Sequence, residues 1–132
     1  MRDQEPGSPW EGFEVISSYS RAQAIADGVL VDVSQHAGEL GITWPVAVTR
    51  ALWDGQVVPS ERSRQRGQSE AGRLHDLLWI FRTVARNASG DTVHFLVLFE
   101  HKGRARKVMV KAVLSLGDSR EPVFTLMLPE ED

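Results

Sequence analysis

The sequence predicts an α+β fold in which N-terminal helices pack on a C-terminal antiparallel meander of three to four strands. Apolar residues recur at helical spacing near residues 69–87, which is the strongest pattern in the chain. Three strand-like stretches follow, over residues 92–100, 106–116 and 122–128. Because helical patterns come first and strand patterns last, a segregated arrangement is favoured over an alternating one.

Length and composition are those of one ordinary domain. The chain has 132 residues, of which 42% are hydrophobic and 25% charged, as in soluble globular proteins. Residues 1–12 are polar and interrupted by proline and glycine, which predicts a flexible N-terminal arm. We therefore expect a single domain over residues 13–132, beginning with a short strand over residues 13–17.

The next segment is expected to hold a capped helix and a strand. Ser20 can cap a helix over residues 21–27 by accepting a free amide, and Gly28 suits the left-handed residue after its end. Residues 29–33 are apolar and mostly β-branched except for Asp32, which favours a strand. Ser34 is expected to cap a further short helical turn.

A second helix is predicted between Pro45 and Gly55, because proline loses no hydrogen bond at a first helical position. Val48, Leu52 and Ala51 would face the core. Residues 56–68 are polar and are predicted to form a loop before the long helix.

The long helix and the strands after it carry most of the expected core. The inward stripe of the helix is expected to comprise Ala71, Leu74, Leu77, Leu78, Phe81, Val84 and Ala85. Residues 92–100 are apolar on both faces at their centre, which predicts a central strand. Residues 106–116 alternate, and Gly103 is placed at the bend of the hairpin that joins these two strands.

Charge and cysteine content narrow the classes of function. The net charge is −3, so no global basic field favours nucleic acid. The lack of cysteine excludes disulfides and thiolate zinc sites, and it agrees with a reducing compartment. No apolar run reaches the ~18–20 residues that span a bilayer, and the N-terminus lacks the apolar core of a signal peptide. We expect a cytoplasmic protein without membrane contact.

Catalytic motifs are absent from the sequence. It contains no phosphate-binding glycine loop, no HExxH and no nucleophile elbow. The four histidines, at positions 36, 75, 94 and 101, are scattered, so a metal site would need the fold to gather them. We expect neither a metal nor another cofactor, and we lean against an enzyme.

Five short stretches of the chain resemble a family of small bacterial proteins. They read ISSYSRAQA with DGVLVDVS, then PVAVTRALW, EAGRLHDLLW and EPVFTLMLPEED, and the resemblance runs from about residue 14 to the end. The family has no established activity, and its members are often met on plasmids, integrated elements and phage. The resemblance implies an intracellular, mobile-element setting, which favours accessory roles such as nucleic-acid handling or countering host defence.

The segment before residue 34 carries four polar candidates for a site, Tyr19, Arg21, Asp27 and Asp32. Arg21 could bind a carboxylate or phosphate in a two-pronged contact. The preferred interpretation is structural, with Arg21 and Asp27 paired and the Tyr19 hydroxyl satisfied. Together with His75, these residues define the alternative function, a small-ligand-binding protein or enzyme with a pocket among all five.

A second candidate site lies on the long helix. His75, Trp79 and Arg82 fall off the apolar stripe and share one flank near Gly72. One interpretation is a packing surface against the preceding helix, with Trp53 meeting Trp79. The other is a binding face, because tryptophan, histidine and arginine are common binding anchors.

Two basic segments complete the candidates. The first carries Arg62, Arg64 and Arg66, and the second carries His101, Lys102, Arg104, Arg106 and Lys107. Either segment could be an ordinary solvated loop or part of a phosphate-binding surface. Few aromatic residues are interleaved with these charges, so stacking on single-stranded bases is not favoured.

The function expected is that of a non-enzymatic accessory protein. It would contact an unknown macromolecule through a face carrying Trp79, Arg82 and one basic segment, with a protein partner preferred over nucleic acid. A homodimer is a further alternative, because exposed apolar sheet faces and edges can pair with themselves.

Overall fold

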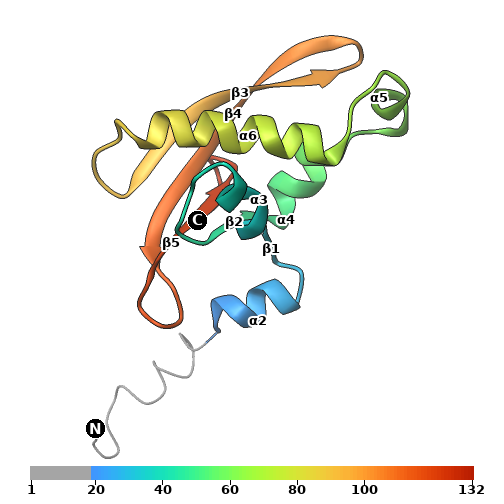
Figure 1. The fold of residues 1–132 in the computed structure, drawn as a ribbon. Coiled ribbons are helices and arrows are strands. Elements are labelled where there is room, and N and C mark those ends of the chain that lie inside the picture. The colour runs from blue at the N-terminus through green and yellow to red at the C-terminus, as the bar shows by residue number, and fades with distance from the viewer. Residues whose placement is uncertain (1–18) are drawn as a thin grey trace, which may run out of the picture.

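A computed structural model describes residues 19–132, in which a five-stranded mixed sheet carries its longest helix on one face (Figure 1). The helices are α2 (Arg21–Ala26), α3 (Ser34–Glu39), α4 (Arg50–Leu52), the π-helical turn η1 (Trp53–Val57), α5 (Glu61–Gln65) and α6 (Glu70–Ala85). The strands are β1 (Leu30–Asp32), β2 (Val46–Thr49), β3 (Thr92–His101), β4 (Arg104–Leu116) and β5 (Pro122–Met127). The arm expected over residues 1–12 and the strand expected over residues 13–17 lie outside the described residues.

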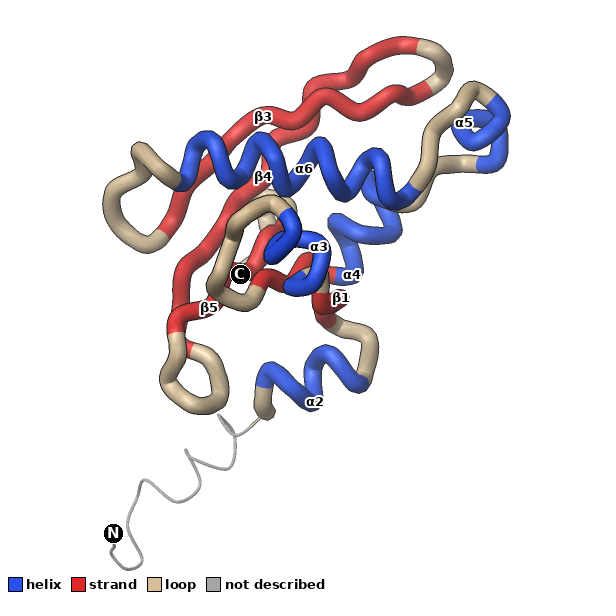
Figure 2. The backbone as a smooth tube through the Cα atoms, viewed as in Figure 1, coloured by secondary structure: helices blue, strands red, loops and turns tan. Residues whose placement is uncertain are grey.

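The α+β class is confirmed, but the sheet is not the antiparallel meander expected. Its strand order is β1-β2-β5-β4-β3, and β2 runs parallel to β5, with Val46 opposite Phe124 and Val48 opposite Leu126. The other pairs are antiparallel. Two early strands therefore extend the C-terminal meander, as the red strands of Figure 2 show. No helix in the described part is long and apolar enough to cross a membrane.

The predicted helix between Pro45 and Gly55 is wrong over its first half. Residues 46–48 are buried in strand β2, where β-branched side chains pack well. Helical structure begins only at α4, whose first turn is capped by the Thr49 hydroxyl, and Gly55 lies inside η1. Val48 and Leu52 are buried as expected, but Ala51 is exposed. Short-range helical signals were overridden by pairing with a distant strand.

The loop predicted over residues 56–68 also contains more structure than expected. It includes the end of η1 and the helix α5, where the Ser63 amide donates to the Ser60 hydroxyl at 3.1 Å. Helix α5 was not predicted because its residues are polar and Ser63 is the one that it buries, so the sequence shows no apolar period there.

The first described unit confirms two predicted features and corrects a third. The Ser20 hydroxyl caps α2 by accepting the amide three residues on at 2.9 Å, and Gly28 has a φ of 80°. The predicted Ser34 cap is wrong, because α3 has no side-chain cap. Ser34 instead donates to Asp32 Oδ1 at 2.6 Å and accepts the Val46 amide at 3.0 Å, which ties the end of β1 to β2.

Strand β3 lies at an edge of the sheet and not at its centre as expected. Phe95, Val97 and Phe99 are buried towards α6, whereas Leu96 and Leu98 on the other face are 49% and 57% exposed. The apolar residues on the second face of β3 are therefore partly exposed, because no helix of the described residues covers that face of the strand. The expected alternation of β4, the hairpin bend at Gly103 and the strand over β5 are confirmed.

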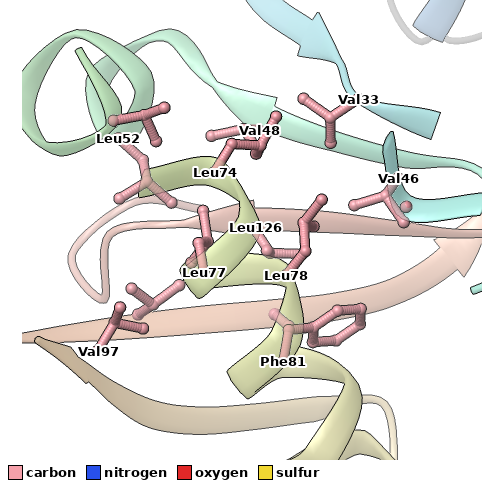
Figure 3. Close-up of a cluster of buried hydrophobic side chains, with 14 of the residues drawn as sticks. Val33, Val46, Val48, Leu52, Leu74, Leu77, Leu78, Phe81, Val97 and Leu126 are labelled. Carbon is pink, nitrogen blue, oxygen red and sulfur yellow. The ribbon is translucent and has the colours of Figure 1, made fainter. Parts of the chain in front are cut away.

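The core lies between α6 and the sheet, as Figure 3 shows. Leu74, Leu77, Leu78 and Phe81 of the predicted stripe are buried. The Phe81 ring meets the edge of Phe124, with centroids 4.9 Å apart. The stripe differs from the prediction at its start, where Ala71 is exposed and the neighbouring Arg73 is buried.

Candidate functional site

Arg21 is held on the sheet by hydrogen bonds to β5. Its Nη1 donates to Thr125 Oγ1 at 2.8 Å and its Nη2 to the Phe124 carbonyl at 2.7 Å. The Asp118 carboxylate accepts the Arg21 amide, which fixes the start of α2. Burial lowers the pKa of Arg21, and the charges of Asp32 and Asp118 oppose that effect. The structural interpretation is therefore favoured, since two guanidinium nitrogens already bond to protein oxygens.

The other polar residues of this segment also make local contacts. The Tyr19 hydroxyl donates to Asp27 Oδ2 at 2.8 Å, and this bond raises the pKa of Tyr19. Asp27 therefore pairs with Tyr19 and not with Arg21 as expected. Asp32 accepts the amide and hydroxyl of Ser34, which turns the chain from β1 into α3.

The five residues of the predicted pocket do not share one described cavity. Tyr19 and Arg21 line an open hollow of about 630 Å³. Arg21 and Asp32 line a second one of about 180 Å³. His75 lies elsewhere, on α6, with its ring 5.9 Å from that of His36. The alternative function consequently gains no support from this geometry.

The flank predicted on α6 forms an ordered group of rings and charge that we name the aromatic column. It consists of His36 from α3 and His75, Trp79 and Arg82 from α6. The His75 and Trp79 rings stack with an interplanar angle of 6° and centroids 6.4 Å apart. The Arg82 guanidinium lies 5.3 Å from the centre of the Trp79 ring on the next turn. Because His75, Trp79 and Arg82 are spaced four and three residues apart, they lie on the same side of α6.

Trp79 is 48% exposed, so the packing interpretation of this flank is wrong. The segment that was expected to cover it is largely strand β2, and Trp53 packs towards the core from η1. Among the described residues, the ring contacts of Trp79 are with His75 and Arg82. Sequence spacing identified three members of the column. His36 was missed because only the tertiary fold places α3 beside α6.

The two basic segments lie side by side. Figure 1 shows α5 next to the tip of the β3–β4 hairpin, and Arg66 Nε lies 2.5 Å from Glu100 Oε2 at the base of that tip. We name the combined surface the basic corner. It comprises Arg62, Arg64, Arg66, Lys102, Arg104, Arg106 and Lys107, all of them exposed.

A buried arginine, Arg73, supports the basic corner from below. Its side chain donates to the Gln56 carbonyl at 2.8 Å and to Gln68 Oε1 at 3.2 Å. It also donates to the carbonyl of Glu100 and lies over the Phe99 ring. Arg73 thus connects η1, the turn before α6 and β3. Arg73 was not predicted from the sequence, although its position four residues before Leu77, on the apolar stripe, is the signal that could have found it.

No cation site is apparent in the described part of the chain, where no three histidine, aspartate or glutamate side chains are grouped to hold a metal ion. His36 and His75 approach each other without a carboxylate to complete such a set.

Comparison with known protein families matches residues 8–132 to DUF6573, a family of unknown function. The chain belongs to the DUF6573 family. No curated protein and no solved structure matches it. The resemblance to a family without an established activity is thus confirmed, whereas the setting of this DUF6573 protein on plasmids and phage stays a prediction.

Acid is expected to weaken the contact between the two halves of the basic corner. Hydrogen bonds from Ser63 and Arg66 lower the pKa of Glu100 from 4.5 to about 2. Since the pKa is lowered by folding, Glu100 stabilises the protein fully above pH 4.5, and this contribution is lost as the pH falls towards 2. Urea unfolding should show Glu100→Gln to be less stable than the wild type at about pH 7, with a smaller gap at about pH 3. A gap that does not change with pH would contradict this role of Glu100.

Proposed function

We propose that this DUF6573 protein is a non-enzymatic binding protein that contacts a partner protein through the aromatic column. The observation that carries the proposal is the half-exposed Trp79 at the centre of an ordered stack. A large ring that is exposed yet held in place by its neighbours has the properties of a binding anchor. Tryptophan and arginine are the residue types most enriched at the energetic centres of protein interfaces.

The side chains of the aromatic column are already ordered in the free protein, which favours tight binding of a partner. The His75 ring and the Arg82 guanidinium both lie beside the Trp79 ring in the protein without a partner. A side chain that is already restrained loses less conformational entropy on binding, so more of the contact energy is retained as affinity. The Arg82 guanidinium adds donors that could meet a carboxylate or carbonyl of the partner.

The setting of the proposed function rests on the sequence resemblance. We place the protein in the bacterial cytoplasm as an accessory product of a mobile element, with a host protein, such as a defence component, as the partner class. A homodimer stays a second prediction, and the backbone edge of strand β3, which is the last strand of the sheet, is the surface that suits it.

Trp79→Ala tests the proposed function. A partner captured from an extract of the producing bacterium would be purified, and its affinity measured for both forms by calorimetry. We expect the variant to bind at least about 30-fold more weakly, the equivalent of ~2 kcal/mol for an interface anchor. Its free energy of unfolding should stay within about 1 kcal/mol of the wild type, because the ring is half exposed.

Leu98→Ala is the matched control. It also removes an exposed apolar side chain, 57% exposed, but from the sheet face that points away from α6. The control should retain full affinity. Equal affinity of the wild type and Trp79→Ala for every captured protein would reject the aromatic column as the binding face.

A further inference from the structure

We infer that the basic corner binds the phosphate backbone of double-stranded DNA, with the end of the β3–β4 hairpin entering the major groove. This inference concerns a different surface and a different class of ligand from the proposed function. It rests on the charges that the fold gathers, on the shape of the hairpin and on the position of each cation along it.

Charge is concentrated at this corner of an otherwise acidic protein. The basic corner holds seven of the chain's 15 lysines and arginines, although the net charge of the chain is −3. Arg64 is paired with Glu70 at 3.4 Å and Arg66 with Glu100. In the part of the chain that the structure describes, the other five have no carboxylate within ion-pair distance, and they are Arg62, Lys102, Arg104, Arg106 and Lys107. These cations are available to neutralise phosphates.

The hairpin extends beyond the sheet as a two-stranded ribbon. Strand β5 pairs only with residues 111–116 of β4, so residues 104–110 of β4 pair with β3 alone. The turn is tight, with φ of 55° at Lys102 and 81° at Gly103, as in the two-residue turns that suit twisted hairpins. A two-stranded ribbon of this kind is one of the two elements that fit the major groove of B-form DNA.

Strand register places cations on both faces of the ribbon. Arg106 pairs with Phe99, which is buried on the side of α6, so Arg104 and Arg106 belong to the face near α5. Lys107 pairs with the exposed Leu98 and belongs to the opposite face. A ribbon lying in a groove has a phosphate chain on each side, and this distribution offers a cation to each of them.

Duplex DNA suits the basic corner better than other nucleic acids. Single strands are held mainly by stacking on several exposed aromatic rings. At this corner Phe99 is buried under Arg73, which leaves His101 as the exposed ring of the described hairpin tip. The major groove of an RNA duplex is too narrow and deep for protein elements to enter. The exposed residues of the ribbon tip include one ring, that of His101, and four lysines and arginines, which suits phosphate contacts better than base stacking.

The test compares two double variants with the same change in charge. Arg104→Gln with Arg106→Gln removes two cations from the basic corner. Arg86→Gln with Arg120→Gln removes two exposed arginines from outside it. Binding to a fluorescent duplex of about 20 base pairs would be followed by anisotropy between about 50 and 200 mM salt.

We expect salt-dependent binding by the wild type and by the control variant. The corner variant should bind at least about tenfold more weakly at ~50 mM salt, and the slope of log affinity against log salt should be smaller in magnitude by about 1.8. Trp79→Ala should bind DNA like the wild type, which separates this inference from the proposed function. Circular dichroism of each variant would confirm an unchanged fold.

Three results would overturn the inference. One is no binding of the wild type to duplex DNA at ~50 mM salt, where phosphate contacts are strongest. Another is an equal loss of affinity in the control and corner variants, which would indicate a diffuse charge effect. The third is equal or tighter binding of single-stranded DNA or of an RNA duplex, which would exclude the major-groove arrangement.

Discussion

Replacing Arg73 with alanine is expected to lower the free energy of unfolding by about 3–5 kcal/mol. The Arg73 side chain is almost fully buried, with the residue 6% exposed, and it is the shared partner of Gln56, Gln68 and Glu100. Its loss would leave two part-buried carbonyls, those of Gln56 and Glu100, and part of the Glu100 carboxylate without this donor, and desolvated groups of this kind are costly when unpaired. Urea unfolding followed by tryptophan fluorescence would measure the change.

Arg64→Ala provides the matched control for Arg73. Both arginines pair with a glutamate at 3.4 Å, but both members of the Arg64–Glu70 pair are more than 40% exposed. Exposed pairs contribute about 0–1 kcal/mol, so Arg64→Ala should be nearly neutral. If Arg73→Ala were equally mild, Arg73 would not be the connection between η1, α6 and β3 that its hydrogen bonds indicate.

Phe81→Ala is expected to destabilise the protein by a similar amount, about 3–5 kcal/mol. Phe81 is 1% exposed and contacts Phe124 and Phe95 from the centre of α6. Truncation would remove ring contacts to two strands and leave a cavity that the sheet cannot fill. Thermal unfolding by calorimetry would detect the loss as a lower melting temperature.

Two comparisons make the Phe81 result specific. Phe81→Leu keeps most of the volume and should cost less than the alanine variant. Trp79→Ala, two residues earlier on the same helix, removes a larger but half-exposed ring and should cost about 1 kcal/mol or less. If Phe81→Ala were as stable as Trp79→Ala, the packing of Phe81 against the sheet would not be a main contribution to the stability of the core.

Local patterns were sufficient to predict much of the fold. The ends of α2 follow from Ser20 and Gly28, because a cap and a left-handed glycine act within a few residues. The course of α6 follows from its apolar period, and the hairpin from Gly103. Pairing of β2 with β5 joins residues far apart in the chain, and no local pattern encodes that choice.

The candidate residues on one helix were predicted correctly to lie together, whereas those that combined several elements were not. The spacing of His75, Trp79 and Arg82 on one helix predicted a shared flank, and the stacking geometry agrees with it. The predicted pocket around Arg21 depended on residues from separate elements, and these residues form separate local contacts instead. A pocket requires relative positions of elements that side-chain spacing within one segment does not specify.

By itself, the sequence determined the α+β class, the long amphipathic helix, the hairpin and the presence of two basic segments, because each depends on neighbours within a few residues. Only the tertiary structure decided that β1 and β2 join the sheet, that His36 completes the aromatic column, and that α5 meets the hairpin to form the basic corner. The physical reason is that burial and pairing between distant segments are set by how whole elements pack. Arg73 was not predicted, because its partners Gln56 and Glu100 come from other elements that only the tertiary structure brings to it.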